Sequence, residues 1–315
     1  MKYLQLVLSI LLLGMPGGNV IARSLGQQVA ELGRVVGEPR SRAEGEAWQA
    51  VAEAKDVGKR VRLAQKFLAD YPRSGLTAYA HRVLANAAHE KGDIENFVQH
   101  GEQVLRELPE TPELLALLAN IYSERGDVVK ATDYASRALP LLDQAGEKPG
   151  AMPSVQWVAL RQGLRAAAHY ALGRCHLELW TKSKSSLKPP EKLRQAVENL
   201  NRTLEMDPQH GYAAFRLGFA QSRSQDAEAA LAAYARACII EGPAAGPARK
   251  NLERIHKDLK RDTASKWSKM SVDEILKEER ERLEAQMAER EQKLNRLAAQ
   301  VDSRELMKTA VPPSN

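Results

Sequence analysis

The sequence predicts an all-α protein, an α-solenoid of antiparallel helix pairs followed by one long C-terminal helix. Three observations indicate this fold. Alanine is abundant and aromatic residues make up only 5% of the 315 residues, and small side chains suit closely packed helices. No segment alternates apolar and polar residues as a half-buried strand does. Finally, Gly92-Asp93 and Gly126-Asp127 stand 34 residues apart, and each pair separates two amphipathic segments.

The N-terminus has the order of a secretory signal. Lys2 supplies a positive charge, the apolar run Leu4–Met15 follows, and small residues precede a cleavage point after Ala22. The run is shorter than the roughly 20 apolar residues that a membrane span needs. We therefore expect a signal peptide over 1–22, a linker over 23–42, and a periplasmic or secreted mature chain with no integral membrane span. Retention of the run as an uncleaved anchor is the alternative.

Glycine, aspartate and proline mark the boundaries of the repeats. Glycine adopts the left-handed turn between two helices without a Cβ clash, and a following aspartate caps the next helix. Pro109 and Pro112 separate two successive units, because proline is tolerated only in the first turn of a helix. Residues 43–260 divide into a degenerate repeat, two regular repeats, an interrupted repeat, a last repeat and a capping helix: 43–74, 78–111, 112–145, 166–210, 211–244 and 246–260.

Two repeats depart from the regular pattern. In the interrupted repeat, Leu172 and Ala196 are separated by about eleven residues more than a 34-residue unit allows. The polar, basic segment 181–191, which contains Pro-Pro, supplies this excess and is expected to be an exposed loop. In the last repeat, Gln225 stands where the turn glycine belongs, at a cost of about 1 kcal/mol.

These positions resemble the tetratricopeptide repeat (TPR) family, and the likeness extends over 43–260. The family pattern places a leucine followed by glycine or alanine on the first helix of each unit, and alanine, an aromatic residue and alanine on the second. The residues that carry the resemblance are Leu84, Ala85, Phe97, Leu118, Ala119, Tyr122, Ala131, Ala135, Ala138, Leu217, Gly218, Ala230, Tyr234 and Ala237. The resemblance is to exported bacterial TPR proteins, and it implies a non-enzymatic scaffold or adaptor without cofactor or metal.

The resemblance also implies where a protein or peptide partner binds. In TPR proteins the first helix of each unit lines the concave face. On this sequence the partner-binding candidates are Arg82, Asn86, His89, Asn120, Tyr170, Arg174, Tyr212, Phe215, Arg216, Phe219 and Arg223, with Glu113 beside them. The last repeat interleaves aromatic residues with arginines, the types that dominate interface energies. The alternative is that these aromatic residues pack against the insertion or the capping helix.

Arg82 and Asn86 resemble part of the clamp that binds a terminal carboxylate in chaperone-binding TPR modules. Leu117 occupies the place of that clamp's second asparagine, so we expect contacts to an acidic peptide rather than a complete clamp.

A second resemblance concerns the biological setting. Phe67, Tyr71-Pro72 and Ser74, followed by an alanine-rich helix, are similar to TPR proteins of outer-membrane assembly and cell-division coordination. The two hypotheses are therefore a general adaptor in the bacterial cell envelope and a factor of that narrower kind.

Catalytic and metal-binding patterns are sparse. Ser185-x-x-Lys188 has the spacing of an acylating serine, but it falls in the polar insertion. His169 and His176 share a helix face without a third ligand nearby in the sequence. Cys175 and Cys238 are interpreted as small core residues. The formal net charge of +6 is spread along the chain, whereas nucleic-acid binders concentrate it on one face, so no nucleic-acid partner is expected.

A charged helix is expected over 262–306, with a disordered tail over 307–315. Ser271 and Glu274 form a capping box at its start. Arginines interrupt an apolar seam of heptad spacing at 280 and 290, and the seam consists of Leu276, Leu283, Met287, Leu294, Leu297 and Val301. One interpretation is a coiled coil that forms a homodimer. The other is a single solvated helix held by the ion pairs Glu278–Arg282 and Glu289–Lys293.

Overall fold

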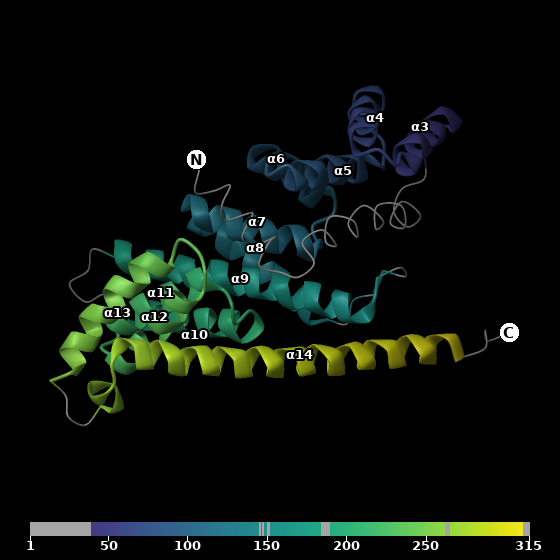
Figure 1. Ribbon diagram of the computed structural model, residues 1–315. Coiled ribbons are helices and arrows are strands. Elements are labelled where there is room, and N and C mark those ends of the chain that lie inside the picture. Colours follow the sequence, from purple (N-terminus) through teal and green to yellow (C-terminus); the bar gives the residue numbers. More distant parts are fainter. Residues whose placement is uncertain are drawn as a thin grey trace. The chain divides into compact units, whose positions relative to one another are not determined.

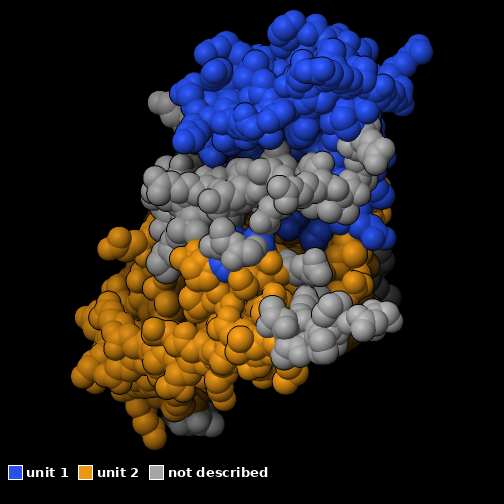
Figure 2. Space-filling view, turned by 90° about the vertical axis from the view of Figure 1, so that its right-hand side faces the viewer, with its two compact units in different colours: residues 1–114, 149–152 blue, residues 115–148, 153–315 orange. Residues whose placement is uncertain are grey.

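The computed structural model describes residues 39–144, 146, 148–149, 152–183, 190–261 and 265–310, and every regular element in these ranges is helical (Figure 1). The chain divides into two compact units, residues 1–114 with 149–152 and residues 115–148 with 153–315 (Figure 2). Several expectations lie outside the described residues: the signal peptide, the linker up to residue 38, the loop segment 184–189 with Ser185 and Lys188, and the tail from residue 311. None of the helices that the structure describes is long and apolar enough to span a membrane.

The first compact unit is built on an aromatic core. It contains α3 (Arg42–Glu53), α4 (Val57–Asp70), α5 (Thr77–Glu90), α6 (Ile94–Glu107) and the first turn of α7 (Pro112–Arg125). Trp48 of α3 packs edge-on against Phe67 of α4, with ring centroids 5.5 Å apart, and lies 6.2 Å from the ring of Tyr79. These contacts join the degenerate repeat to the first regular repeat.

The second compact unit continues the series of helix pairs. After the rest of α7 it contains α8 (Val128–Asp143), α9 (Ser154–Lys182), α10 (Pro190–Met206), α11 (Gly211–Arg223), α12 (Ala227–Ile239), α13 (Ala245–Leu259), the short η1 (Lys266–Lys269) and α14 (Val272–Ala310). Each helix from α8 to α12 packs on the next one in the chain, and α13 covers α12. This arrangement confirms a TPR-type α-solenoid with a long C-terminal helix.

Helix α9 begins earlier than the interrupted repeat that we expected from residue 166. It runs for 29 residues from Ser154, and Trp157, Leu160 and Leu164 in its added turns are buried. No proline or left-handed glycine interrupts these turns, so the helix continues across the expected boundary. These added turns precede Leu172, so the excess between Leu172 and Ala196 lies instead in the end of α9 at Lys182, the start of α10 at Pro190 and the connection between them.

The turns between paired helices share one geometry. Gly92, Gly126 and Gln225 have φ angles of 68°, 76° and 62°, and Gln225 is the non-glycine residue with positive φ among those described. In each case the next backbone N–H donates to the carbonyl five residues earlier, the Schellman pattern that ends a helix. The predicted aspartate caps are confirmed, because Asp93 and Asp127 accept from the backbone N–H three residues ahead.

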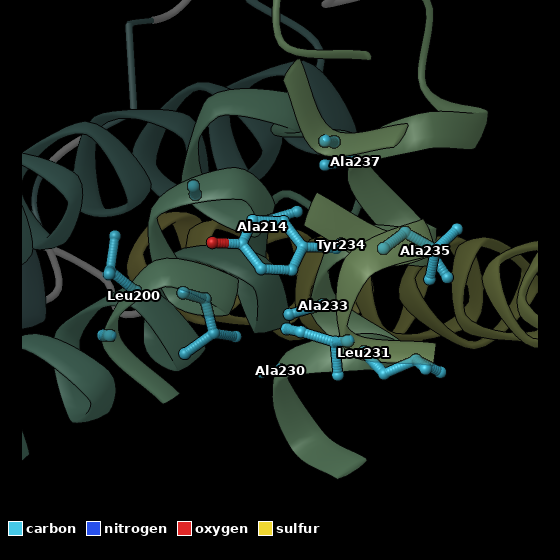
Figure 3. Packing of buried hydrophobic residues seen from close by; sticks show 14 of the residues in the cluster. Leu200, Ala214, Ala230, Leu231, Ala233, Tyr234, Ala235 and Ala237 are labelled. Carbon is cyan, nitrogen blue, oxygen red and sulfur yellow. The ribbon is translucent and has the colours of Figure 1, made fainter. Parts of the chain in front are cut away.

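Close approach of the two helices within the last repeat depends on small residues. A Cβ added to Gly218 of α11 would lie 2.9 Å from the ring of Tyr234 on α12, so only glycine fits there. Tyr234 is 1% exposed among the alanines of α12 and Leu200 of α10 (Figure 3). The Leu-Gly pattern that we used to recognise the repeat therefore has a steric cause.

Helix α14 packs onto its own chain, which neither interpretation of its seam anticipated. It contacts α12 and α9, and its seam residues Leu283 and Leu294 are less exposed than the residues beside them. Ile275 is fully buried in the core of the second compact unit. The predicted Ser271–Glu274 capping box is confirmed by hydrogen bonds in both directions. A homodimer through this helix stays a prediction, and it would have to form while the seam contacts the solenoid.

Polar contacts fix the register of α14 against the solenoid. Arg236 of α12 forms a buried ion pair with Glu279, with Nε and Oε1 2.8 Å apart. Arg290, which interrupts the seam, donates from Nε to the carbonyl oxygen of Met206 at the end of α10, at 2.7 Å. The expected Glu278–Arg282 pair is replaced, because Glu278 pairs with Lys266 and Arg282 with Glu279.

Candidate protein-binding face

The candidates in the first compact unit are packed into the repeat. Arg82 is 5% exposed and lies 3.8 Å from the Glu113 carboxylate. His89 is buried against Phe97, with ring centroids 5.1 Å apart. Asn86 is half-buried, and its Nδ2 atom has no hydrogen-bond partner among the described residues. The partial likeness to a carboxylate clamp is therefore not supported, because Glu113 already faces Arg82.

A polar network ties α7, α9 and α11 together in the second compact unit. The Arg216 Nε donates to the Tyr170 hydroxyl at 3.0 Å, and that hydroxyl donates to Glu124 Oε1 at 3.4 Å. Arg174 forms an ion pair with the same carboxylate and donates to the Glu124 carbonyl oxygen at 3.1 Å. Tyr170 and Arg174 thus contact one carboxylate that sequence reasoning missed, and Arg216 joins this network through the Tyr170 hydroxyl. Since Tyr170 is 2% exposed, it holds neighbouring helices together and is not accessible to a partner.

Burial sets the protonation of this network. It raises the pKa of the Tyr170 hydroxyl, so the group stays neutral. Burial opposes the charge on Arg216, but the Tyr170 oxygen and Glu124 outweigh it and raise the Arg216 pKa. His210 stacks on Tyr170 at 4.4 Å and accepts from the Ala213 N–H, and burial lowers its pKa. Because Nδ1 of His210 accepts a hydrogen bond, it carries no proton, which agrees with a neutral imidazole.

The outer part of the face consists of Trp180, Phe219 and Arg223, which we call the aromatic–arginine face. Phe219 meets Trp180 edge-on, with ring centroids 6.5 Å apart, and the Arg223 guanidinium lies 5.1 Å from the Phe219 ring centroid. Both aromatic residues are half-buried, whereas Arg223 is exposed. In the part of the chain that the structure describes, Arg223 has no carboxylate partner.

The remaining candidates contribute mainly to packing. Phe215 lies edge-on against Tyr234, with ring centroids 5.7 Å apart, and joins α11 to α12. Tyr212 is half-buried against the same core, and Asn120 is 5% exposed. Trp180, which sequence reasoning missed, lies in the last turn of α9, directly before the polar insertion. A tryptophan at the end of a helix and next to a polar segment is the sequence signal that could have found it.

The histidines and cysteines singled out in the sequence have structural partners or apolar surroundings. His169 Nδ1 lies 2.9 Å from Asn199 Oδ1, and burial lowers the pKa of both His169 and His176. Burial raises the pKa of Cys175 and of Cys238 to about 11, so both thiols are protonated at neutral pH. Within the described ranges, no three His, Cys, Asp or Glu side chains are placed to hold a metal ion.

No protein-family model and no curated protein matches the sequence. Among solved structures, the chain is similar to a crystal structure of MamA protein at 15% identity, covering 76% of this chain and 100% of that one with a TM-score of 0.39. It is also similar to the crystal structure of yeast Tom70 at 14% identity, covering 70% of this chain and 40% of that one with a TM-score of 0.41. The helix pairs and the turns between them establish the fold of this chain.

Proposed function

We propose that the protein is a non-enzymatic scaffold that binds a protein or peptide partner at the aromatic–arginine face. The observation that carries the proposal is Arg223, an exposed cation beside two half-buried aromatic rings. The other arginines expected at the site, Arg82, Arg174 and Arg216, face oxygen atoms of the chain itself. Arg223 is therefore the arginine of this set that remains available to a partner.

The chemistry of this face favours an acidic segment of a folded or extended partner. Tryptophan and arginine are enriched among the residues that contribute most to binding. An arginine that already stacks on an aromatic ring loses little conformational freedom when it meets a carboxylate. Trp180 and Phe219 supply apolar area from two successive first helices, which a scaffold needs to hold a continuous segment.

The capture experiment follows from these contacts. Arg223→Glu should weaken cross-linked capture of a partner from cell-envelope extracts by more than about tenfold, because it replaces the available cation with a like charge. Arg202→Glu is the matched control, since Arg202 is an exposed arginine on α10 whose partner is Glu198. Equal capture by both variants, each checked for folding by circular dichroism, would contradict the proposal. The Phe215 and Arg216 positions suggested by the sequence are less suitable, since both pack against neighbouring helices.

We also propose that the protein acts in the bacterial cell envelope. The proposal is supported by the order of charge, apolar run and small residues over 1–22. Fractionation of cells that express a C-terminally tagged chain, with mass spectrometry of its N-terminus, tests this. A mature chain that starts at residue 23 in the periplasmic fraction is the expected result. An unprocessed chain in the cytoplasmic fraction would contradict it, and an unprocessed chain in the membrane would indicate a retained anchor.

A further inference from the structure

A pocket adjoins the aromatic–arginine face at the end of the last repeat's first helix. Its volume is about 500 Å³. Three elements line it, namely the end of α9, the start of α10 and the turn from α11 to α12, through Trp180, Pro190, Leu193, Arg194, Val197, Arg223, Ser224 and Gln225. The wall is apolar at Trp180, Leu193 and Val197, and it is polar at the turn and at Arg194 of α10. No carboxylate is among these lining residues.

The turn in this pocket wall is conformationally costly. Gln225 holds a φ of 62°, while Gly92 and Gly126 hold similar angles at the same place in the regular repeats. A side chain in this left-handed conformation destabilises the fold relative to glycine. The N–H after the turn residue donates in the same way in all three turns, and the N–H of the turn residue itself donates to the carbonyl three residues earlier at Gly92 and Gly126. The glutamine therefore adds no backbone hydrogen bond that glycine lacks. What it adds is an exposed amide at the pocket, and this amide makes no hydrogen bond within the described chain.

The charge of the pocket is positive. Arg194 is shared between Glu191 and Glu198, which leaves Arg223 as the cation with no carboxylate partner among the described residues. An uncharged apolar ligand would leave Arg223 unused, and a basic ligand would be repelled by it. The complementary ligand therefore combines an apolar group with a negative charge close to it.

We propose that this pocket is an anchor subsite for one aromatic side chain of an acidic peptide segment. The aromatic ring enters between Trp180 and Val197, a neighbouring carboxylate pairs with Arg223, and the Gln225 amide hydrogen-bonds the peptide backbone. Backbone strain at Gln225 is retained because its side chain contacts the ligand. The inference rests on the proposed function, since the peptide is a segment of the partner that the scaffold holds.

The probe is a fluorescein-labelled synthetic peptide with a central tryptophan flanked by aspartates, and its dissociation constant is measured by fluorescence anisotropy on the full chain. Serine in place of the tryptophan should weaken binding by at least about tenfold, the effect of removing one buried aromatic side chain. Lysines in place of the aspartates should abolish binding. A peptide that does not bind, or that binds equally well with serine, overturns the anchor subsite.

Gln225→Gly separates the ligand role from folding. This substitution should raise the thermal midpoint by a few degrees, because it relieves the left-handed strain. The same variant should bind the tryptophan peptide at least about fivefold more weakly. A lower thermal midpoint, or unchanged peptide affinity, overturns the role of Gln225. The tryptophan peptide could fail to bind although Arg223→Glu still weakens capture from envelope extracts. That result would refute the anchor subsite and leave the proposed function standing.

Discussion

Two of the differences between the last repeat and the second regular repeat lie around the same turn and change its chemistry. Gly126 occupies the turn in the regular repeat and Gln225 in the last one, with φ angles of 76° and 62°. Two residues before the turn, the regular repeat has Glu124 and the last repeat has Arg223. Glu124 binds Tyr170 and Arg174 inside the stack, whereas Arg223 is exposed beside a pocket.

Under the proposed function, this difference separates positions that stabilise the stack from positions that take part in recognition. A position that joins one repeat to the next must carry a side chain that its neighbour satisfies, as Glu124 does. At the end of the array no further repeat of this kind follows, so the equivalent position is released from that requirement. An arginine there and a strained glutamine after it become available to a ligand.

The largest expected effect is the loss of stability when the ion pair of Arg236 is broken. Arg236 belongs to the last repeat, and it is buried whereas Arg223 is exposed. Arg236 is buried against Glu279, and Glu279→Ala leaves its charge without compensation. We expect a loss of about 3 kcal/mol in the free energy of unfolding, measured by urea denaturation. Arg223→Ala, the exposed counterpart, should cost less than about 0.5 kcal/mol. Similar losses in the two variants would contradict the distinction between structural and available arginines.

A smaller loss is expected when the regular repeat is changed at the compared position. Glu124→Ala removes the acceptor of Tyr170 and the partner of Arg174, both of which keep little contact with water. We expect a loss of about 2 kcal/mol in the free energy of unfolding. A chain that unfolds at the same urea concentration as the wild type would show that the network does not stabilise the stack.

Exchanging the turn residues tests the comparison directly. Gly126→Gln should destabilise the chain by about 1 kcal/mol, because it introduces in the regular repeat the left-handed side chain of the last one. An added Cβ at Gly126 would lie 3.2 Å from the Glu178 carboxylate oxygen, the mobile end of a side chain, so the backbone conformation dominates the effect. The change is measured as a lower thermal midpoint, opposite in sign to that of Gln225→Gly.

The smallest expected effect is a change in the pH dependence of stability. It concerns the first regular repeat, which contains a histidine pair that the second regular and last repeats lack. The Nδ1 atoms of His81 and His100 lie 3.1 Å apart. Burial lowers the pKa of both below their ordinary value, although Glu107 and Asp93 act in the other direction. As the pH falls, these histidines therefore become protonated in the unfolded chain before they do in the folded chain. The free energy of unfolding decreases as the pH drops below about 6.5. The double substitution His81→Gln, His100→Gln should make the decline in thermal midpoint between pH 7 and pH 5 shallower.

Local features of the fold were predictable from the sequence, and contacts between distant segments were not. The aspartate caps and the capping box depend on residues within one turn of each other, and the repeat period is the recurrence of one such local turn; the structure confirms all three. The heptad seam around Leu283 and Leu294 shows only that α14 has an apolar face, because periodicity does not identify what covers it. Glu124 escaped notice for a similar reason, since its partners Tyr170 and Arg174 lie 46 and 50 residues away.

The docking of α14 has a consequence for how the molecule folds. Contacts in a solenoid are mostly between neighbouring repeats, so such arrays open progressively from their ends. Here Arg290 meets Met206 across 84 residues and Asp302 accepts a hydrogen bond from Ser154 across 148. These long-range contacts slow folding, since the chain must close large loops before they form. They also link the last repeats to the start of α9, so we expect hydrogen exchange to reveal one cooperative opening of the second compact unit instead of stepwise fraying.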